Sequence, residues 1–217
     1  MKRISISILG STGSIGVNTL DVLARHPQRF EVFALSAASN AQRLLEQCLT
    51  YRPRYAVLRS EEAAARLQVQ LRQAGATTVV LCGIAGLERI AVDPQVDCVM
   101  AAIVGAAGLV PSLAAAAAGK RILLANKEAL VMSGSLFMHT AQAHGATLIP
   151  VDSEHNALFQ LLEGMPREQV LALGNPSWRI TMFLDGHLVE RFSYRANGER
   201  FGLVELSDGS VKHVETN

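Results

Sequence analysis

The chain has 217 residues, of which 49% are apolar, and its 20 basic and 19 acidic side chains leave a formal net charge of +1. This length suits one large domain or one domain with a smaller appendage, and the apolar share is ample for a buried core. The near-neutral balance argues against a nucleic-acid or anionic-membrane surface, although a local patch would not show in the sum.

Three further features bear on the compartment. Cys48, Cys82 and Cys98 are odd in number and lie in apolar surroundings, which predicts buried thiols in a reduced, cytoplasmic setting. Serines and a glycine break the apolar run of residues 1–10, so no secretory signal is expected there. Residues 98–119 carry no charge over a spanning length, yet they are mostly alanine and glycine and contain Pro111. A buried strand followed by a small-residue helix fits them better than a membrane span.

Short apolar runs alternate with helical periods over the first three quarters of the chain. The expected strands are residues 4–9, 31–35, 55–59, 77–82, 98–103, 121–125 and 147–151. The expected helices are residues 14–26, 41–52, 60–75, 109–120 and 127–145, with Ser60 as an N-cap and Gly75, Gly119 and Gly145 at C-termini. Strands that lack alternation and are separated by helices predict a parallel sheet covered on both faces. The expected fold class is therefore α/β, a doubly wound, Rossmann-like parallel sheet.

The character of the sequence changes near residue 164. From there apolar and polar residues alternate, and turn signals occur at Asp185-Gly186, Asn197-Gly198 and Asp208-Gly209. This pattern predicts antiparallel hairpins. The sequence therefore predicts two regions, a Rossmann-like domain over residues 1–163 and a short β-rich segment over residues 164–217.

The first expected strand runs directly into GSTGSIG, residues 10–16. Gly10, Gly13 and Gly16 would let the backbone turn sharply and a pyrophosphate approach the start of the following helix. Hydroxyl donors could come from Ser11, Thr12 and Ser14. The motif has its strand before it and its helix after it, which favours dinucleotide binding over a tight turn that binds nothing.

The end of the second strand indicates which dinucleotide would bind. An NAD site places an acidic residue there for the ribose 2′-hydroxyl, but Glu31 lies at the opposite end of this strand. Ser36, Ser39 and Asn40 offer donors without repulsion, and Arg43 follows one helical turn later. A 2′-phosphate would be accommodated, so NADP is favoured over NAD. The alternative is a solvated loop and helix cap.

Two more polar clusters follow strands. Asp152 and Glu154, within IPVDSEHNALFQ at residues 149–160, would point to one side of an extended segment and suit Mg²⁺ or Mn²⁺. Taken alone, helix capping by Asp152 or Ser153 is the stronger interpretation. A hydrolase using Ser153 with His155 and Asp152 is disfavoured, because neighbours along a strand face opposite sides.

The second cluster is Asn126, Lys127 and Glu128, between the strand at 121–125 and the helix that follows. In an open α/β sheet this carboxyl edge is where ligands bind. The alternative is that Asn126 caps the helix and Lys127 is solvated.

GSTGSIG, ANKEALV and PVDSEHNALFQ, in this order and at these separations, resemble 1-deoxy-D-xylulose 5-phosphate reductoisomerase. The resemblance covers about residues 3–163. It implies an NADPH-dependent enzyme that converts 1-deoxy-D-xylulose 5-phosphate to 2-C-methyl-D-erythritol 4-phosphate in the non-mevalonate route to isoprenoids. It also implies a divalent metal (Mg²⁺, Mn²⁺ or Co²⁺) and a homodimer.

The resemblance assigns roles to individual positions. Thr12, Gly13, Ser14 and Ile15 would hold the pyrophosphate, with Gly10 shaping the turn. Ser39 and Asn40 would take the adenosine ribose phosphate, and Asn126 and Glu128 would lie near the nicotinamide. Lys127 and Ser153 would contact the sugar phosphate substrate, and Asp152 and Glu154 would ligate the metal.

The family's catalytic domain continues with a further acidic ligand, a phosphate-binding set and a lid, and no second Asn-Lys pair occurs after Lys127. Two carboxylates alone bind Mg²⁺ weakly. The residue pattern is therefore expected to supply the cofactor half of the enzyme, with the activity of this chain by itself left open. The alternative is a non-catalytic NADP-binding module.

Overall fold

A computed structural model describes residues 2–151, Asn156, Gln160, and residues 177–184, 187–195, 200–205 and 211–215. The chain forms two compact units, residues 1–156 and residues 157–217. The predicted boundary after residue 163 lies among residues outside this description and stays a prediction.

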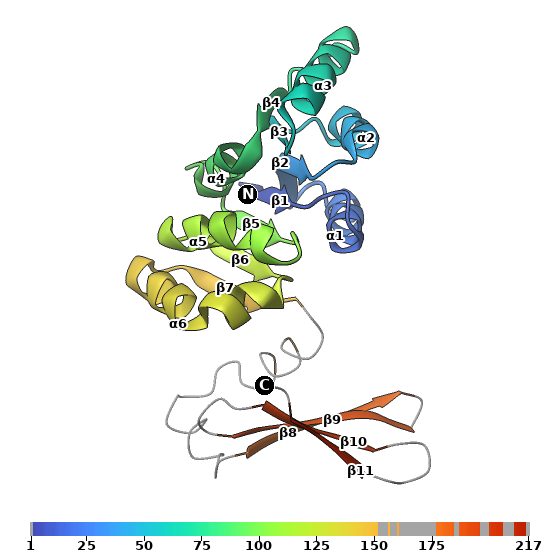
Figure 1. Cartoon of the computed structure of the whole chain (residues 1–217). Helices are drawn as coiled ribbons and strands as arrows, with labels where there is room; N and C mark the ends of the chain where they lie inside the picture. Colours follow the sequence, from blue (N-terminus) through green and yellow to red (C-terminus); the bar gives the residue numbers. More distant parts are fainter. Residues whose placement is uncertain are drawn as a thin grey trace. The chain divides into compact units, whose positions relative to one another are not determined.

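The first unit is built on one seven-stranded sheet whose strands all run parallel (Figure 1). Its strands are β1 (Ile4–Leu9), β2 (Phe30–Ala37), β3 (Tyr55–Leu58), β4 (Val79–Cys82), β5 (Cys98–Ala101), β6 (Arg121–Leu124) and β7 (Thr147–Pro150). Their order is β4-β3-β2-β1-β5-β6-β7. All seven predicted strands are therefore present, and the doubly wound fold is confirmed.

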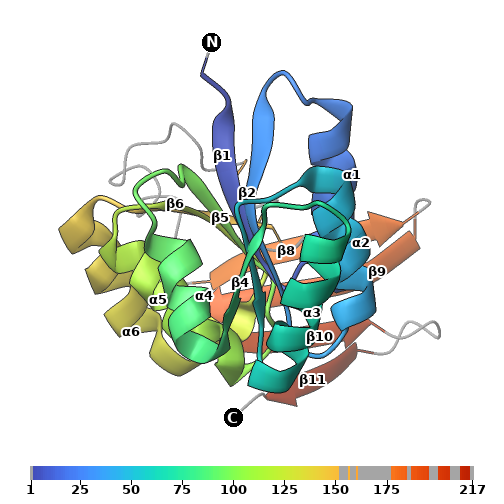
Figure 2. The same ribbon diagram turned by 90° about the horizontal axis from the view of Figure 1, so that it is seen from above.

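Helices cover both faces of this sheet. They are α1 (Ser14–Arg25), α2 (Ala41–Tyr51), α3 (Glu61–Gln73), α4 (Gly83–Val92), the short 3₁₀ helix η1 (Ala106–Gly108), α5 (Leu109–Ala117) and α6 (Lys127–His144). Figures 1 and 2 both show α1, α2 and α3 on one face and α4, α5 and α6 on the other. The sequence prediction missed α4, which carries two glycines in its first turn.

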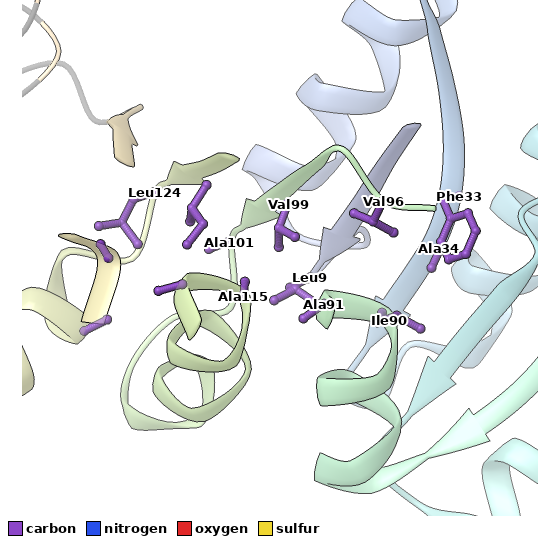
Figure 3. Close-up of a cluster of buried hydrophobic side chains, with 14 of the residues drawn as sticks. Leu9, Phe33, Ala34, Ile90, Ala91, Val96, Val99, Ala101, Ala115 and Leu124 are labelled. Carbon is purple, nitrogen blue, oxygen red and sulfur yellow. The ribbon is translucent and has the colours of Figure 1, made fainter. Parts of the chain in front are cut away.

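The sheet separates two hydrophobic cores. One lies under α1–α3 and includes Ile6, Ile8 and Leu44. The other, drawn in Figure 3, packs Leu9 and Val99 of the sheet against Ile90 of α4 and small residues of α5. Because β1 contributes to both cores, it is buried on both faces, and Ser5 and Ser7 are as buried as the isoleucines with which they alternate.

Several local signals act as the sequence predicts. The Ser60 hydroxyl accepts a hydrogen bond from the Ala63 amide at the start of α3. The three predicted C-terminal glycines have positive φ, the left-handed conformation that commonly ends a helix. Pro111 lies in the first turn of α5, where its missing N–H costs no helical hydrogen bond. In the part of the chain that the structure describes, no helix has the length and apolarity needed to cross a bilayer.

The order of strands reverses between β1 and β5. Strands β2, β3 and β4 extend the sheet from one side of β1, while β5, β6 and β7 extend it from the other. In open α/β sheets, ligands bind beyond the carboxyl ends of the strands at such a switch point. The turns that follow β1 and β5 are therefore where a ligand is expected to bind.

The second unit contains a four-stranded antiparallel sheet, as its alternating sequence predicts. Its strands are β8 (Ser177–Leu184), β9 (His187–Arg195), β10 (Arg200–Glu205) and β11 (Val211–Glu215). Each strand pairs with its neighbours in the chain, in the order β11-β10-β9-β8.

Candidate functional site

The turn after β1 is shaped by two glycines that the fold itself requires. Gly10 has φ +87°, and a Cβ there would lie 2.9 Å from the Ala102 carbonyl oxygen in the loop after β5. A Cβ on Gly16 would lie 2.4 Å from the Gly10 carbonyl oxygen and 2.5 Å from the Ser11 Cα. The Gly13 amide donates to the Gly10 carbonyl at 3.2 Å, which closes a β-turn. Helix α1 therefore begins tightly against the turn at the switch point.

Gly13 differs from both of these residues. It is exposed, its φ of −78° and ψ of 170° suit any residue, and the nearest atom to an added Cβ is 3.5 Å away. Nothing in the described protein requires a glycine at this position. Gly13 lies at the N-terminus of α1. A glycine that the fold does not require at this place is consistent with a ligand that approaches the backbone closely.

The start of α1 has the features of an anion site. Among the described residues, no side chain caps α1, whereas Asn40, Ser60 and Asn126 cap α2, α3 and α6. The first amides of a helix have no partner within the helix and carry its partial positive charge. Thr12 is half-buried and Ser14 is exposed, and their role as donors to a bound anion stays a prediction.

Two of the predicted hydroxyl donors point elsewhere. Ser11 is fully buried, and its Oγ lies 2.7 Å from the Gln47 Oε1. The buried Ser36 Oγ accepts a hydrogen bond from the Gly10 amide at 2.9 Å. The prediction that Ser11 and Ser36 donate to a ligand is therefore wrong, because both hydroxyls hold the turn together from inside.

The end of β2 presents polar, non-acidic groups. Ser39, Asn40 and Arg43 are exposed beyond Ala37, and the Asn40 Oδ1 caps α2 by accepting from the Arg43 amide at 3.1 Å. Glu31 forms an ion pair of 2.8 Å with Arg3 at the opposite end of β2. At the rise of a strand, it is about 20 Å from the end of β2. No carboxylate of β2 therefore reaches the place where an NAD ribose would bind.

The loop after β5 belongs to the same edge, and the sequence analysis missed it. Its Val104 is 78% exposed, although it follows a buried strand. The Asn126 Nδ2 donates to the Gly105 carbonyl at 3.1 Å, while its Oδ1 accepts from the Ala129 amide at 3.2 Å. Asn126 is 1% exposed, so it both caps α6 and ties that helix to the loop. The glycines at 105 and 108 were the available signal.

The remaining predicted positions are described only in part. Lys127 begins α6 and Glu128 is half-buried in the first turn, but the side chain of Lys127 lies outside the described part. Asp152, Ser153 and Glu154 also lie outside the described residues. The continuously described part of the chain ends just after β7 at Val151, whose amide donates to the Leu124 carbonyl at 3.0 Å. The metal-ligand prediction therefore stays a prediction.

Two of the three cysteines are buried thiols. Burial raises the pKa of the Cys48 thiol to about 12 and that of the Cys98 thiol to about 11. Both thiols are therefore protonated at neutral pH and behave as small apolar side chains. Cys82 is only half-buried, so the prediction of a buried thiol is correct for Cys48 and Cys98 and wrong for Cys82.

The fold and the glycine turn at the switch point define a Rossmann-like α/β domain. The family model of 1-deoxy-D-xylulose 5-phosphate reductoisomerase matches residues 6–134. The chain therefore belongs to the 1-deoxy-D-xylulose 5-phosphate reductoisomerase family.

Curated relatives and solved structures agree with this assignment. The reductoisomerase of Nitrosospira multiformis is 60% identical over 157 residues, and that of Methylococcus capsulatus is 61% identical over 170 residues. These matches cover 72% and 78% of this chain but only 40% and 43% of the relatives. The chain thus spans about two fifths of the length of the curated relatives it matches.

Two solved structures are similar over a comparable share of the chain. A DOX-P reductoisomerase in complex with NADPH, fosmidomycin and magnesium has 48% sequence identity and a TM-score of 0.74, over 78% of this chain and 41% of that one. The Zymomonas mobilis enzyme in complex with NADPH has 38% identity and a TM-score of 0.71, over 78% and 43%.

Proposed function

We propose that this chain forms the NADPH-binding part of a 1-deoxy-D-xylulose 5-phosphate reductoisomerase. Its membership of that family supports the reaction, in which 1-deoxy-D-xylulose 5-phosphate becomes 2-C-methyl-D-erythritol 4-phosphate. The binding proposal is supported chiefly by the N-terminus of α1 (the mouth of α1), where the space beside Gly13 is not filled by other residues of the described protein. That room fits a pyrophosphate, which needs close approach to backbone amides.

Each residue around this opening has a distinct part in the proposal. Gly10 and Gly16 shape the turn, and the amides at the start of α1 would face the pyrophosphate. Thr12 and Ser14 would add hydroxyl donors. Ile15 is 39% exposed in the first turn, where it would supply an apolar contact.

The preference for NADPH over NADH rests on the end of β2. Ser39 and the Nδ2 of Asn40 can donate to a 2′-phosphate, and Arg43 is exposed on the first turn of α2. A carboxylate at this point would repel the phosphate, and the nearest one in β2 is paired with Arg3 at the far end. When bound, NADPH supplies the hydride for the reduction.

The carboxyl edge near β6 and β7 would hold the substrate. Lys127 and Ser153 are proposed to contact the sugar phosphate, and Asn126 fixes the start of α6 next to Lys127. Asp152 and Glu154 are proposed as carboxylate ligands of Mg²⁺ or Mn²⁺, which prefer oxygen donors. A divalent ion held there would polarise the oxygens of the substrate.

Calorimetric titration of the full chain with NADPH and with NADH tests the binding proposal. We expect tighter binding of NADPH, and we expect Arg43→Ala to weaken NADPH about tenfold while NADH binding hardly changes. Arg66→Ala, an exposed arginine on α3, is the matched control and should change neither affinity. Equal binding of the two coenzymes would contradict the proposed preference.

A second assay separates binding from catalysis. Oxidation of NADPH is followed with 1-deoxy-D-xylulose 5-phosphate in the presence and absence of Mg²⁺. Metal-dependent oxidation supports the reductoisomerase activity. NADPH binding without turnover would favour the non-catalytic NADP-binding module instead.

A further inference from the structure

Every polar group of Ser11 is held from inside the protein. Its amide donates to the Ser36 carbonyl at 2.8 Å, and its Oγ lies 2.7 Å from the Gln47 Oε1. Its carbonyl accepts from the Gln47 Nε2 at 2.9 Å. Ser11 is 0% exposed, so these contacts are shielded from water. Gln47 therefore binds both the main chain and the side chain of a single residue in the glycine turn.

Gln47 reaches the turn from a separate element. It lies on α2, 36 residues after Ser11, and is only 8% exposed. Both ends of its amide are used, one as a donor and one as an acceptor. A buried amide with satisfied hydrogen bonds fixes the position of its partner, because leaving either group unpaired is costly.

The bond to the Ser11 carbonyl has a consequence for the next residue. In a trans peptide the carbonyl and the following N–H point in opposite directions. Because the Ser11 carbonyl is turned inward to Gln47, the Thr12 amide is turned away from Gln47. Thr12, unlike Ser11, is only half-buried, and it leads directly to the exposed Gly13 and Ser14.

We propose that Gln47 is a positioning residue that aims the Thr12 amide, and with it the mouth of α1, at the pyrophosphate of the nicotinamide coenzyme. This inference rests on the proposed coenzyme binding. Gln47 acts through Ser11 and does not touch the coenzyme. Its contribution is to orient the donors before binding, so that the coenzyme does not have to order them.

The test compares Gln47→Met with Gln68→Met in the full chain. Gln68 is a matched control, because this half-buried glutamine of α3 also makes one donor and one acceptor bond, to the Thr78 carbonyl at 3.2 Å and from the Val80 amide at 2.8 Å. Those bonds lie at β4, away from the glycine turn. Urea unfolding and calorimetric titration with NADPH are measured for both variants and the parent chain.

We expect Gln47→Met to weaken NADPH binding about tenfold or more, and Gln68→Met to leave it within about twofold even if both lose stability. Gln47→Glu supplies a rescue experiment, because a protonated carboxyl regains the donor that the carboxylate lacks. Its affinity for NADP⁺ relative to the parent chain should rise as the pH falls from 8 to 6.

The outcomes separate the inference from the proposed function. A parent chain that binds no NADPH overturns both. A parent chain that binds, with Gln47→Met binding equally well, overturns the role of Gln47 alone. If Gln47→Met does not fold, a pH-independent affinity ratio for Gln47→Glu overturns it instead.

Discussion

Gly108 leaves the space that the amide of Asn126 occupies. A Cβ at Gly108 would lie 2.4 Å from the Asn126 Nδ2 and equally close to the Ile103 carbonyl oxygen. The φ of −83° at Gly108 suits any residue, so the requirement for glycine there is steric. The pair joins the loop after β5 to the start of α6, at the edge where the coenzyme and substrate are proposed to bind.

Gly108→Ala is expected to destabilise the protein by about 1–3 kcal/mol, because the added methyl group must displace backbone or the Asn126 amide. Urea unfolding measures the change. Asn126→Ala removes one of the two clashes, so the double variant should lose less than the sum of the single losses. Additive losses would show that the two residues do not compete for space.

Ser5 and Ser7 point from β1 into the same side of the sheet but differ in their partners. The Ser7 Oγ donates to the Ile90 carbonyl at 2.7 Å, whereas the buried Ser5 Oγ has no partner among the described residues. Ser5→Ala should stabilise the protein by about 1 kcal/mol, and Ser7→Ala should destabilise it by a similar amount. Thermal and urea unfolding of the two variants measure these changes in stability. A loss of stability in Ser5→Ala would contradict this interpretation.

Arg52 ends α2 in the left-handed conformation, with φ 48° and ψ 53°. That conformation costs a side-chain-bearing residue about 1–2 kcal/mol, and glycine adopts it freely. Glycine also increases the conformational entropy of the unfolded chain, which offsets part of this gain. Arg52→Gly should therefore stabilise the protein by about 0.5–1 kcal/mol. Arg52→Ala keeps the Cβ and should bring no gain, so equal effects of the two substitutions would rule out the conformational cause.

Asp97, just before β5, is hydrogen-bonded to β1, and we expect it to make the free energy of unfolding fall at acid pH. The Ser5 amide donates to its carboxylate at 2.9 Å, and this bond, with Lys2 nearby, holds the pKa of the carboxyl below its usual value. A lowered folded-state pKa means that the stabilisation is present at neutral pH and is lost as the pH falls through that value. Asp97→Asn should lower stability at pH 7 and make it less dependent on pH below 5. A parallel profile for both proteins would show that Asp97 does not contribute.

The sequence predicted the elements of the first unit better than their arrangement. Continuous apolar runs such as residues 98–101 identify buried strands, because in a parallel sheet both faces are covered. Helix α4 was missed because glycines normally oppose helix formation. A Cβ at Gly86 would lie 2.9 Å from Val57, so this glycine lets α4 approach the sheet.

The site was predictable where it depends on neighbours in the sequence. The glycine turn and the polar end of β2 are local patterns, and the structure places both at the carboxyl edge. The inward direction of the Ser11 hydroxyl depends on Gln47, 36 residues away. The tie between Asn126 and Gly105 depends on the pairing of β5 with β6. Such contacts between distant residues follow from the strand order, which the residue pattern alone did not supply.

The most direct test of coenzyme binding at the mouth of α1 is a calorimetric titration of Gly13→Ala with NADPH. An added methyl group there meets no atom closer than 3.5 Å, so urea unfolding should be close to that of the parent chain. It would occupy the space proposed for the pyrophosphate, and we expect at least about a tenfold loss of affinity. A Gly13→Ala protein that binds NADPH as tightly as the parent chain would contradict the account.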